Sequence, residues 1–131
     1  MKVLMLTTAS SLMDGINRHI LTIANALHKV GNCKIAVCTV FPEGELNKAL
    51  KDAGVTCFSL NARSGHDFRV LMAFYKLMRT YQPDVVHCHV MALFERIVSS
   101  VCFRHLKYVN TIHGISDAPP HFPEKICVNV Y

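Results

Sequence analysis

The sequence predicts one α/β domain built on an open, mostly parallel sheet of about six strands, with helices on both faces. Short apolar runs alternate along the chain with longer runs whose apolar residues recur every three or four positions. The short runs are apolar at nearly every position, which is typical of parallel strands buried on both faces. The chain has 131 residues, of which 51% are hydrophobic, so it can bury the core of one domain but has no room for two.

The expected strands and helices alternate over most of the chain. Strands are expected at residues 2–8, 33–40, 55–60, 84–89, 107–112 and 125–131. Helices are expected at residues 16–30, 45–53, 67–81 and 92–103. No internal repeat or interdomain linker interrupts this order. Strands that alternate with helices form βαβ units, so the expected fold class is Rossmann-like.

Turn and capping residues mark the ends of these helices. Gly31, followed by Asn32, ends the first helix as a C-terminal cap does. Gly54 ends the second helix. Asp67 is the expected N-cap of the third helix, which Pro83 cannot continue. The helix ends therefore agree with the apolar periodicity.

The charge pattern argues against a nucleic-acid-binding protein. Lys and Arg number 14 and Asp and Glu number nine, which gives a net charge of +5. The basic residues are scattered, and the sequence has no block of five or six like charges. A mildly basic surface of this kind is either simply solvated or attracts anionic lipid or phosphorylated substrates. The composition leaves both interpretations open.

No segment predicts export or a membrane span. The apolar stretch at residues 3–6 is shorter than the core of a secretory signal, and no apolar run approaches the roughly 20 residues that cross a bilayer. The six cysteines include no closely spaced pair, so they do not predict a zinc site. We therefore expect a cytoplasmic protein with reduced thiols.

Candidate functional residues are sought where the strands end, because open parallel sheets bind ligands outside the carboxyl ends of their strands. Residues 8–15 form a loop that enters the first helix, and a helix N-terminus suits a phosphate group. Gly15 would let a ligand approach the backbone closely. Asp14 either contacts the ligand or only caps the helix. One glycine is not the fingerprint of a dinucleotide site.

Histidines close the fourth and fifth expected strands. His87 and His89 alternate along the fourth strand, so they are expected to share a face. They allow two interpretations, which are a metal site completed by His113 and a pair bonded to nearby loop backbone. His113 precedes Gly114, which permits a tight turn where a substrate would sit. The sequence has no nucleophile elbow, phosphate-loop lysine or zinc-protease helix motif.

Four segments in order resemble the beginning of a family 4 glycosyltransferase. The first is MKVLMLTT together with Gly15 and His19 at the start of the first helix. The others are Gly54 with the valine that follows it, residues 81–89 (YQPDVVHCH), and residues 111–114 (TIHG). The resemblance covers almost the whole chain. Each motif is weak alone, and the four in this order are fairly specific.

The resemblance implies the GT-B architecture, in which two Rossmann-like domains face each other across the active site. It implies a retaining, hexosyltransferase-type enzyme that moves a sugar from a nucleotide-sugar donor to a glycan or lipid-linked acceptor, in cell-surface polysaccharide or glycolipid synthesis. By the same resemblance His113 is the catalytic residue, and no metal or cofactor is expected. The residues that it implies for substrate binding are Asp14, Gly15, His19, His89 and Gly114.

The sequence departs from the family pattern in two respects. Asp14 stands where the family usually has paired glycines, and a carboxylate beside a diphosphate is unfavourable unless it turns away or caps the helix. The family's second, C-terminal Rossmann-like domain has no counterpart in these 131 residues. We therefore expect an N-terminal, acceptor-side domain that is incomplete at its C-terminus and inactive by itself.

Two other functions are compatible with the sequence. One is a stand-alone nucleotide- or phosphate-binding module without catalysis. The other is a truncated product that pairs with a second copy or another protein through an exposed sheet edge. The expected partners are thus the two substrates, a second domain, the inner face of the membrane and a second copy of the chain, but not nucleic acid.

Overall fold

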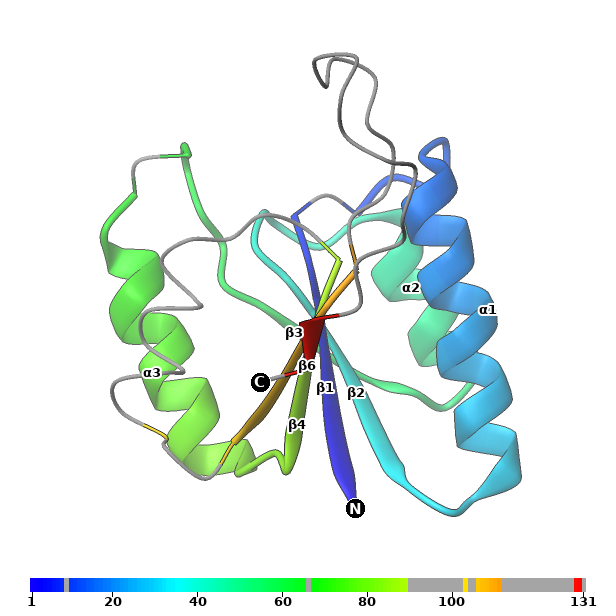
Figure 1. Ribbon diagram of the computed structural model, residues 1–131. Coiled ribbons are helices and arrows are strands. Elements are labelled where there is room, and N and C mark those ends of the chain that lie inside the picture. Colours follow the sequence, from blue (N-terminus) through cyan, green and yellow to red (C-terminus); the bar gives the residue numbers. More distant parts are fainter. Residues whose placement is uncertain (9, 66, 90–102, 104–105, 112–128, 131) are drawn as a thin grey trace, which may run out of the picture.

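The computed structural model describes residues 1–8, 10–65, 67–89, 103, 106–111 and 129–130. The strands are β1 (Lys2–Thr7), β2 (Lys34–Thr39), β3 (Thr56–Ser59), β4 (Val85–Cys88), β5 (Lys107–Asn110) and β6 (Asn129–Val130). They form one sheet in the order β3-β2-β1-β4-β5-β6. Neighbours from β3 to β5 are parallel, and β6 is antiparallel to β5. The predicted open, mostly parallel sheet is confirmed (Figure 1).

The three described helices connect consecutive parallel strands. They are α1 (Gly15–Val30), α2 (Glu45–Asp52) and α3 (Arg69–Tyr81). Gly31 ends α1 as predicted, because its backbone is left-handed at φ 73° and its N–H donates to the carbonyl of Leu27 at 3.3 Å. The predicted helix at residues 92–103 lies outside the described residues, apart from Phe103. The same holds for most of the predicted last strand, of which the structure describes β6.

The start of α3 differs from the prediction. The helix begins at Arg69, and its N-cap position is held by Phe68 rather than Asp67. Asp67 still serves the helix start, because its carboxylate accepts the backbone N–H of Arg69 at 3.2 Å and that of Arg63 at 3.0 Å. An acidic side chain that satisfies N–H groups from both sides stabilises the turn just before the helix, which shifts the helical backbone two residues along.

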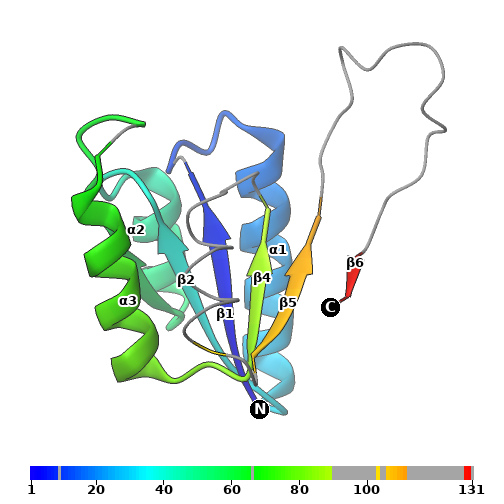
Figure 2. The ribbon, with the colours of Figure 1, turned by 60° about the vertical axis from the view of Figure 1, so that its left-hand side comes forward.

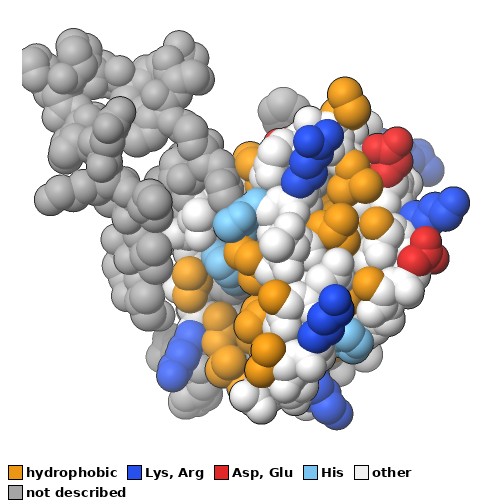
Figure 3. Space-filling view, turned by 90° about the vertical axis from the view of Figure 1, so that its right-hand side faces the viewer, with side chains coloured by type: hydrophobic (Ala, Val, Ile, Leu, Met, Phe, Trp, Pro, Cys, Tyr) orange, Lys and Arg blue, Asp and Glu red, His pale blue; other side chains and the backbone are white. Residues whose placement is uncertain are grey.

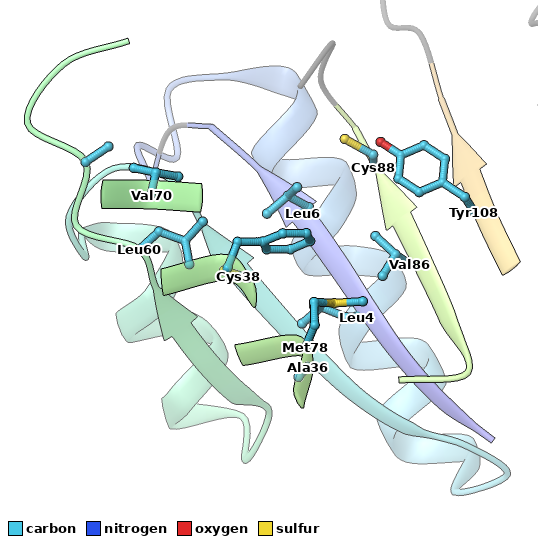
Figure 4. Close-up of a cluster of buried hydrophobic side chains, with 12 residues drawn as sticks. Leu4, Leu6, Ala36, Cys38, Leu60, Val70, Met78, Val86, Cys88 and Tyr108 are labelled. Atoms are coloured by element: carbon cyan, nitrogen blue, oxygen red, sulfur yellow. The ribbon is translucent and has the colours of Figure 1, made fainter. Parts of the chain in front are cut away.

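Alternation along the strands sends side chains to two separate cores. On one face, residues such as Leu4 and Val86 pack against Phe74 and Met78 of α3 (Figure 4). On the other face, Val3 and its odd-numbered neighbours pack against α1 and α2. Helices therefore cover both faces, as predicted, with α3 on one side and α1 and α2 on the other (Figure 1).

The order of the strands reverses between β1 and β4, which are parallel neighbours in the middle of the sheet. The chain moves outward through β2 and β3 on one side of β1, and through β4 and β5 on the other. The carboxyl ends of these strands lie together at one end of the sheet, which we call the carboxyl edge. Figure 2 shows the strand arrows pointing toward it. A reversal of this kind is the place where open α/β sheets bind ligands.

Candidate functional site

The first loop enters α1 through a capped helix start. Asp14 is the N-cap, and its carboxylate accepts the backbone N–H of Ile16 at 2.9 Å. The side chain therefore caps the helix, as one of the two sequence interpretations held. Gly15 follows as the first helical residue and is exposed, with no atom within 4 Å of the position that a Cβ would take. The start of α1 thus lies open to a ligand at the carboxyl edge.

A buried polar pair joins the end of β1 to α1. The hydroxyl of Thr7 donates to Oδ1 of Asn17 at 3.0 Å, and Nδ2 of Asn17 donates to the carbonyl of Ser11 at 2.8 Å. Thr7 is 2% exposed and Asn17 is fully buried. The three residues hold the first loop against its strand and its helix. A loop fixed in this way is already shaped before any ligand arrives.

The end of β2 repeats this arrangement. Thr39 pairs with Thr7 in the register of the sheet and accepts a hydrogen bond on its hydroxyl from Nδ2 of Asn47, at 3.4 Å. Oδ1 of Asn47 accepts the N–H of Gly44 at 3.1 Å. Both βα connections at this edge are therefore fastened by a buried asparagine in the first turn of the following helix.

The two loops also hold each other. The N–H of Leu46 donates to the carbonyl of Ser10 at 2.8 Å, and the N–H of Leu12 donates to the carboxylate of Glu45 at 3.1 Å. A Cβ at Gly44 would lie against Oγ of Ser10 and 3.1 Å from its Cβ and carbonyl oxygen, so any other residue here would require Ser10 to move. The loops that follow β1 and β2 are thus held to each other by hydrogen bonds.

Three histidines meet beside these loops. His87 of β4 and His89 just after it point to the same face of the sheet, with ring centroids 4.1 Å apart. This confirms the prediction from strand alternation. His19 of α1 approaches His89 edge-on, at 6.2 Å between centroids. Nε2 of His87 lies 2.8 Å from the hydroxyl of Thr111, which follows β5.

The histidines differ in how far solvent reaches them. His89 is 2% exposed, His87 is half-buried and His19 is exposed. Histidine side chains are visible on the α1 side of the molecule in Figure 3. The cluster therefore runs from the surface of α1 to the buried end of β4. An imidazole can donate or accept a hydrogen bond, so this row offers such groups to a hydroxyl-rich or anionic ligand.

The structure brings four of the predicted residues to one region. Asp14, Gly15 and His19 come from the start of α1, and His89 comes from the end of β4. The predicted catalytic residue His113 and its neighbour Gly114 lie outside the described residues. Within the described part of the chain, no three His, Cys, Asp or Glu side chains are arranged to hold a metal ion.

Two residues at this edge were not predicted as part of the site. The sequence predicts His87 only as a partner of His89, with His113 in one interpretation. Its contact with Thr111 requires the pairing of β4 with β5. Asn17 holds the first loop in place, because its side-chain amide donates to the carbonyl of Ser11. A signal for Asn17 exists in the sequence, because this polar residue falls on the apolar face of α1, three positions before the buried Ile20.

A surface depression with a volume of about 1200 Å³ lies at the opposite edge of the sheet. Its lining includes Lys2, Lys34 and Lys107, which begin β1, β2 and β5, and Arg79 near the end of α3. It is therefore separated from the histidines by the length of the strands. We place the candidate site at the carboxyl edge, because the strand order reverses there and the histidines and capped loop converge there.

Shifted pKa values lie away from the histidines. Burial raises the pKa of the Cys57 thiol on β3 to about 11, so this cysteine stays protonated at neutral pH. Hydrogen bonds from Arg69 and from the backbone of Arg63 lower the pKa of Asp67. Both side chains lie away from the carboxyl ends of β1 and β4, so neither belongs to the candidate site.

The chain matches the model of a known protein family. Residues 13–126, most of the chain, match the family model described as Glycosyltransferase Family 4. No curated protein sequence is similar enough to this chain to count as a relative. No helix among the described residues is long and apolar enough to cross a membrane.

Solved structures with the same fold include sugar-handling enzymes. A glycosyltransferase from Rickettsia africae ESF-5 has a TM-score of 0.68 and 23% identity, over 91% of this chain and 31% of that chain. MurG from Acinetobacter baumannii has a TM-score of 0.66 and 16% identity, over 98% of this chain and 44% of that chain. A UDP-GlcNAc 2-epimerase from Methanocaldococcus jannaschii has a TM-score of 0.56 and 15% identity, over 96% and 35%. This chain thus spans less than half the length of each of these proteins.

Proposed function

Because this chain belongs to glycosyltransferase family 4, we propose that it is the N-terminal, acceptor-side domain of a retaining, hexosyltransferase-type enzyme. The enzyme moves a sugar from a nucleotide-sugar donor to a glycan or lipid-linked acceptor, in the synthesis of cell-surface polysaccharide or glycolipid. The observation that carries this proposal is the meeting of His19 and His89 beside the exposed start of α1, where the strand order reverses.

The proposal gives each residue at this edge a role. The exposed backbone at Gly15 receives the diphosphate side of the donor or the acceptor, because the first N–H groups of a helix have no partner within the helix. Asp14 acts by holding this helix start in place, since its carboxylate already accepts the N–H of Ile16. His19, which is exposed, binds substrate hydroxyls, and His89, which is 2% exposed, positions it from behind. His113 is proposed as the catalytic residue, with Gly114 beside it.

We propose that a second Rossmann-like domain completes the enzyme and holds the nucleotide. The support is the 31% and 44% coverage of the Rickettsia africae glycosyltransferase and of MurG. The reaction assigned to the intact protein uses the nucleotide sugar as a co-substrate and no metal or cofactor. The departing phosphate oxygen takes the acceptor proton as the new glycosidic bond forms. The 131-residue chain alone is therefore inactive.

The proposed location is the cytoplasm, at the inner face of the membrane, where lipid-linked acceptors are found. A dimer is proposed through β3, which lies at one edge of the sheet and so presents unpaired backbone groups. Sedimentation velocity of the purified chain at micromolar concentration checks the dimer. A single monomeric species would contradict it without affecting the proposed reaction.

A calorimetric titration separates this function from a stand-alone nucleotide-binding module. UDP, GDP and ADP are titrated in turn into the purified chain. Because the nucleotide site is assigned to the second domain, we expect only millimolar or weaker binding. Micromolar binding of any of the three would favour the module.

Nucleotide release with a complete second domain tests the reaction itself. The chain extended by a donor-binding Rossmann-like domain is compared with the chain alone, using UDP-, GDP- and ADP-sugars with acceptor. We expect release only from the extended protein, and a loss of about tenfold or more in His19→Ala and His89→Ala, as for a lost hydrogen-bond partner. His28→Ala is the matched control, because it lies at the other end of α1. Transfer by the chain alone would overturn the proposal.

A further inference from the structure

The outward face of α3 carries an exposed apolar stripe. Phe68, Met72 and Tyr75 are 69%, 59% and 37% exposed, and their spacing of four and three places them on one side of the helix. The opposite side packs into the core through Phe74 and Met78, which are 0% and 1% exposed. The helix therefore has an apolar face toward the sheet and a second, narrower apolar stripe toward solvent. The ring of Tyr75 also contacts that of Phe103, at 5.8 Å between centroids, so Phe68 and Met72 are the most exposed members of the stripe. Core packing does not explain these two.

Cations flank this stripe. Arg69, Lys76 and Arg79 are exposed, and the α3 sequence RVLMAFYKLMRTY contains no acidic residue. The carboxylate nearest in sequence, Asp67, is engaged by the Arg69 side chain, and its own side chain is only 9% exposed. The solvent-facing side of α3 is thus both apolar and positively charged.

We propose that α3 docks the protein on the surface of an anionic lipid bilayer. Apolar side chains that project from a helix enter the boundary between headgroups and acyl chains, and cations beside them contact lipid phosphates. The partner is a bilayer rather than a protein because the pattern needs only a layer of negative charge over apolar chains. Three apolar side chains are a small contact for a stable protein interface, which usually involves about 20 residues a side.

Docking through α3 fixes how the sheet lies against the bilayer. Because α3 connects the parallel strands β3 and β4, it runs against the strand direction, and its Phe68 end lies toward the carboxyl edge of the sheet (Figure 1). Docking through α3 lays the strands along the bilayer, with α1 and α2 on the far side and the carboxyl edge at the side of the molecule. That a lipid-linked acceptor reaches this edge from the bilayer rests on the proposed function. The docking itself does not, so either can fail alone.

Co-sedimentation with vesicles tests the docking. The purified chain is mixed with vesicles of phosphatidylcholine alone and with vesicles that also contain the anionic lipid phosphatidylglycerol. We expect binding to the anionic vesicles that weakens as salt rises, and little binding to the neutral ones. Equal binding to both, or none to the anionic vesicles, would overturn the proposal.

Two pairs of variants locate the contact. Phe68→Ser with Met72→Ser removes apolar contact and should weaken binding roughly tenfold or more. Lys76→Gln with Arg79→Gln should weaken it roughly fivefold for each charge lost. Val30→Ser and Lys48→Gln are the controls, because they change an exposed apolar residue of α1 and an exposed lysine of α2. Docking through α3 is refuted if the controls weaken binding as much as the α3 variants.

A reporter variant keeps the test valid if the serine variants unfold. The chain contains no tryptophan, so Phe68→Trp introduces a single emitting residue on the proposed contact. Anionic vesicles should shift its emission to the blue, and lipids brominated on the acyl chain should quench it. Val30→Trp should respond to neither. An unshifted, unquenched Phe68→Trp would contradict insertion of this face.

Discussion

Asn17 shows how one buried polar residue shapes the candidate site. It joins the hydroxyl of Thr7 to the carbonyl of Ser11, and no water reaches it because it is fully buried. Its position on the apolar side of α1 marks it in the sequence as unusual. The sequence alone could not say what it contacts, because that depends on how the loop folds back over the helix.

Replacing Asn17 with alanine should destabilise the protein. The change leaves the buried Thr7 hydroxyl and the part-buried Ser11 carbonyl without these partners, which costs about 1–3 kcal/mol. Urea unfolding followed by circular dichroism measures the loss. Thr22→Ala, on the exposed side of the same helix, should change the free energy of unfolding by about 0.5 kcal/mol or less. Equal effects of the two changes would contradict the assigned role.

The sequence predicts one feature of the histidine cluster but not another. The shared face of His87 and His89 follows from the two-residue period of a strand, so it could be predicted and is confirmed. The approach of His19 could not be predicted from spacing, because it depends on where α1 crosses the end of β4. His113 remains a prediction.

At the scale of elements, the ends of the helices follow local chemistry. Gly31 could be identified from the sequence because a left-handed backbone favours glycine, and φ is 73° there. The helix α3 begins two residues later than the sequence predicts, because a sequence cannot distinguish an aspartate at the N-cap from one that supports the preceding turn. Gln82 ends α3 with φ 50°, and the proline after it gives no indication that this residue is left-handed.

The two faces of α3 predict opposite responses to truncation. Phe74→Ala should cost about 3–5 kcal/mol, because it leaves a cavity among fully buried side chains. Met72→Ala lies on the same helix but is 59% exposed, and it should change the free energy of unfolding by about 0.5 kcal/mol or less. Thermal and urea unfolding of both variants provide the comparison. A large loss in Met72→Ala would mean that the outward face is packed in solution.

At the scale of the whole molecule, the fold class could be predicted but the strand order could not. Alternating strands and helices require parallel neighbours, whichever strand each crossover reaches. The chain could continue outward after β3, but it returns to the centre and places β4 beside β1, with Val3 opposite Val85. That return creates the reversal where the histidines and the α1 loop meet. Local sequence patterns do not predict this return. It depends on which face of the sheet α3 packs against and on which strand the chain reaches after it.

The stability of the whole chain should depend on pH through Asp67. Its carboxylate accepts hydrogen bonds from the Arg69 side chain and from two backbone N–H groups, and these lower its pKa in the folded protein. A carboxyl whose pKa is lower when folded stabilises the protein above its unfolded pKa of about 4, and this contribution is lost as the pH falls below that value. Urea unfolding between pH 7 and pH 3 should therefore show falling stability at the acid end. Asp67→Asn should be less stable at pH 7 and lose less on acidification, whereas Asp52→Asn, an exposed change on α2, should keep the wild-type slope. If Asp67→Asn and wild type lose stability in parallel, these hydrogen bonds do not form in solution.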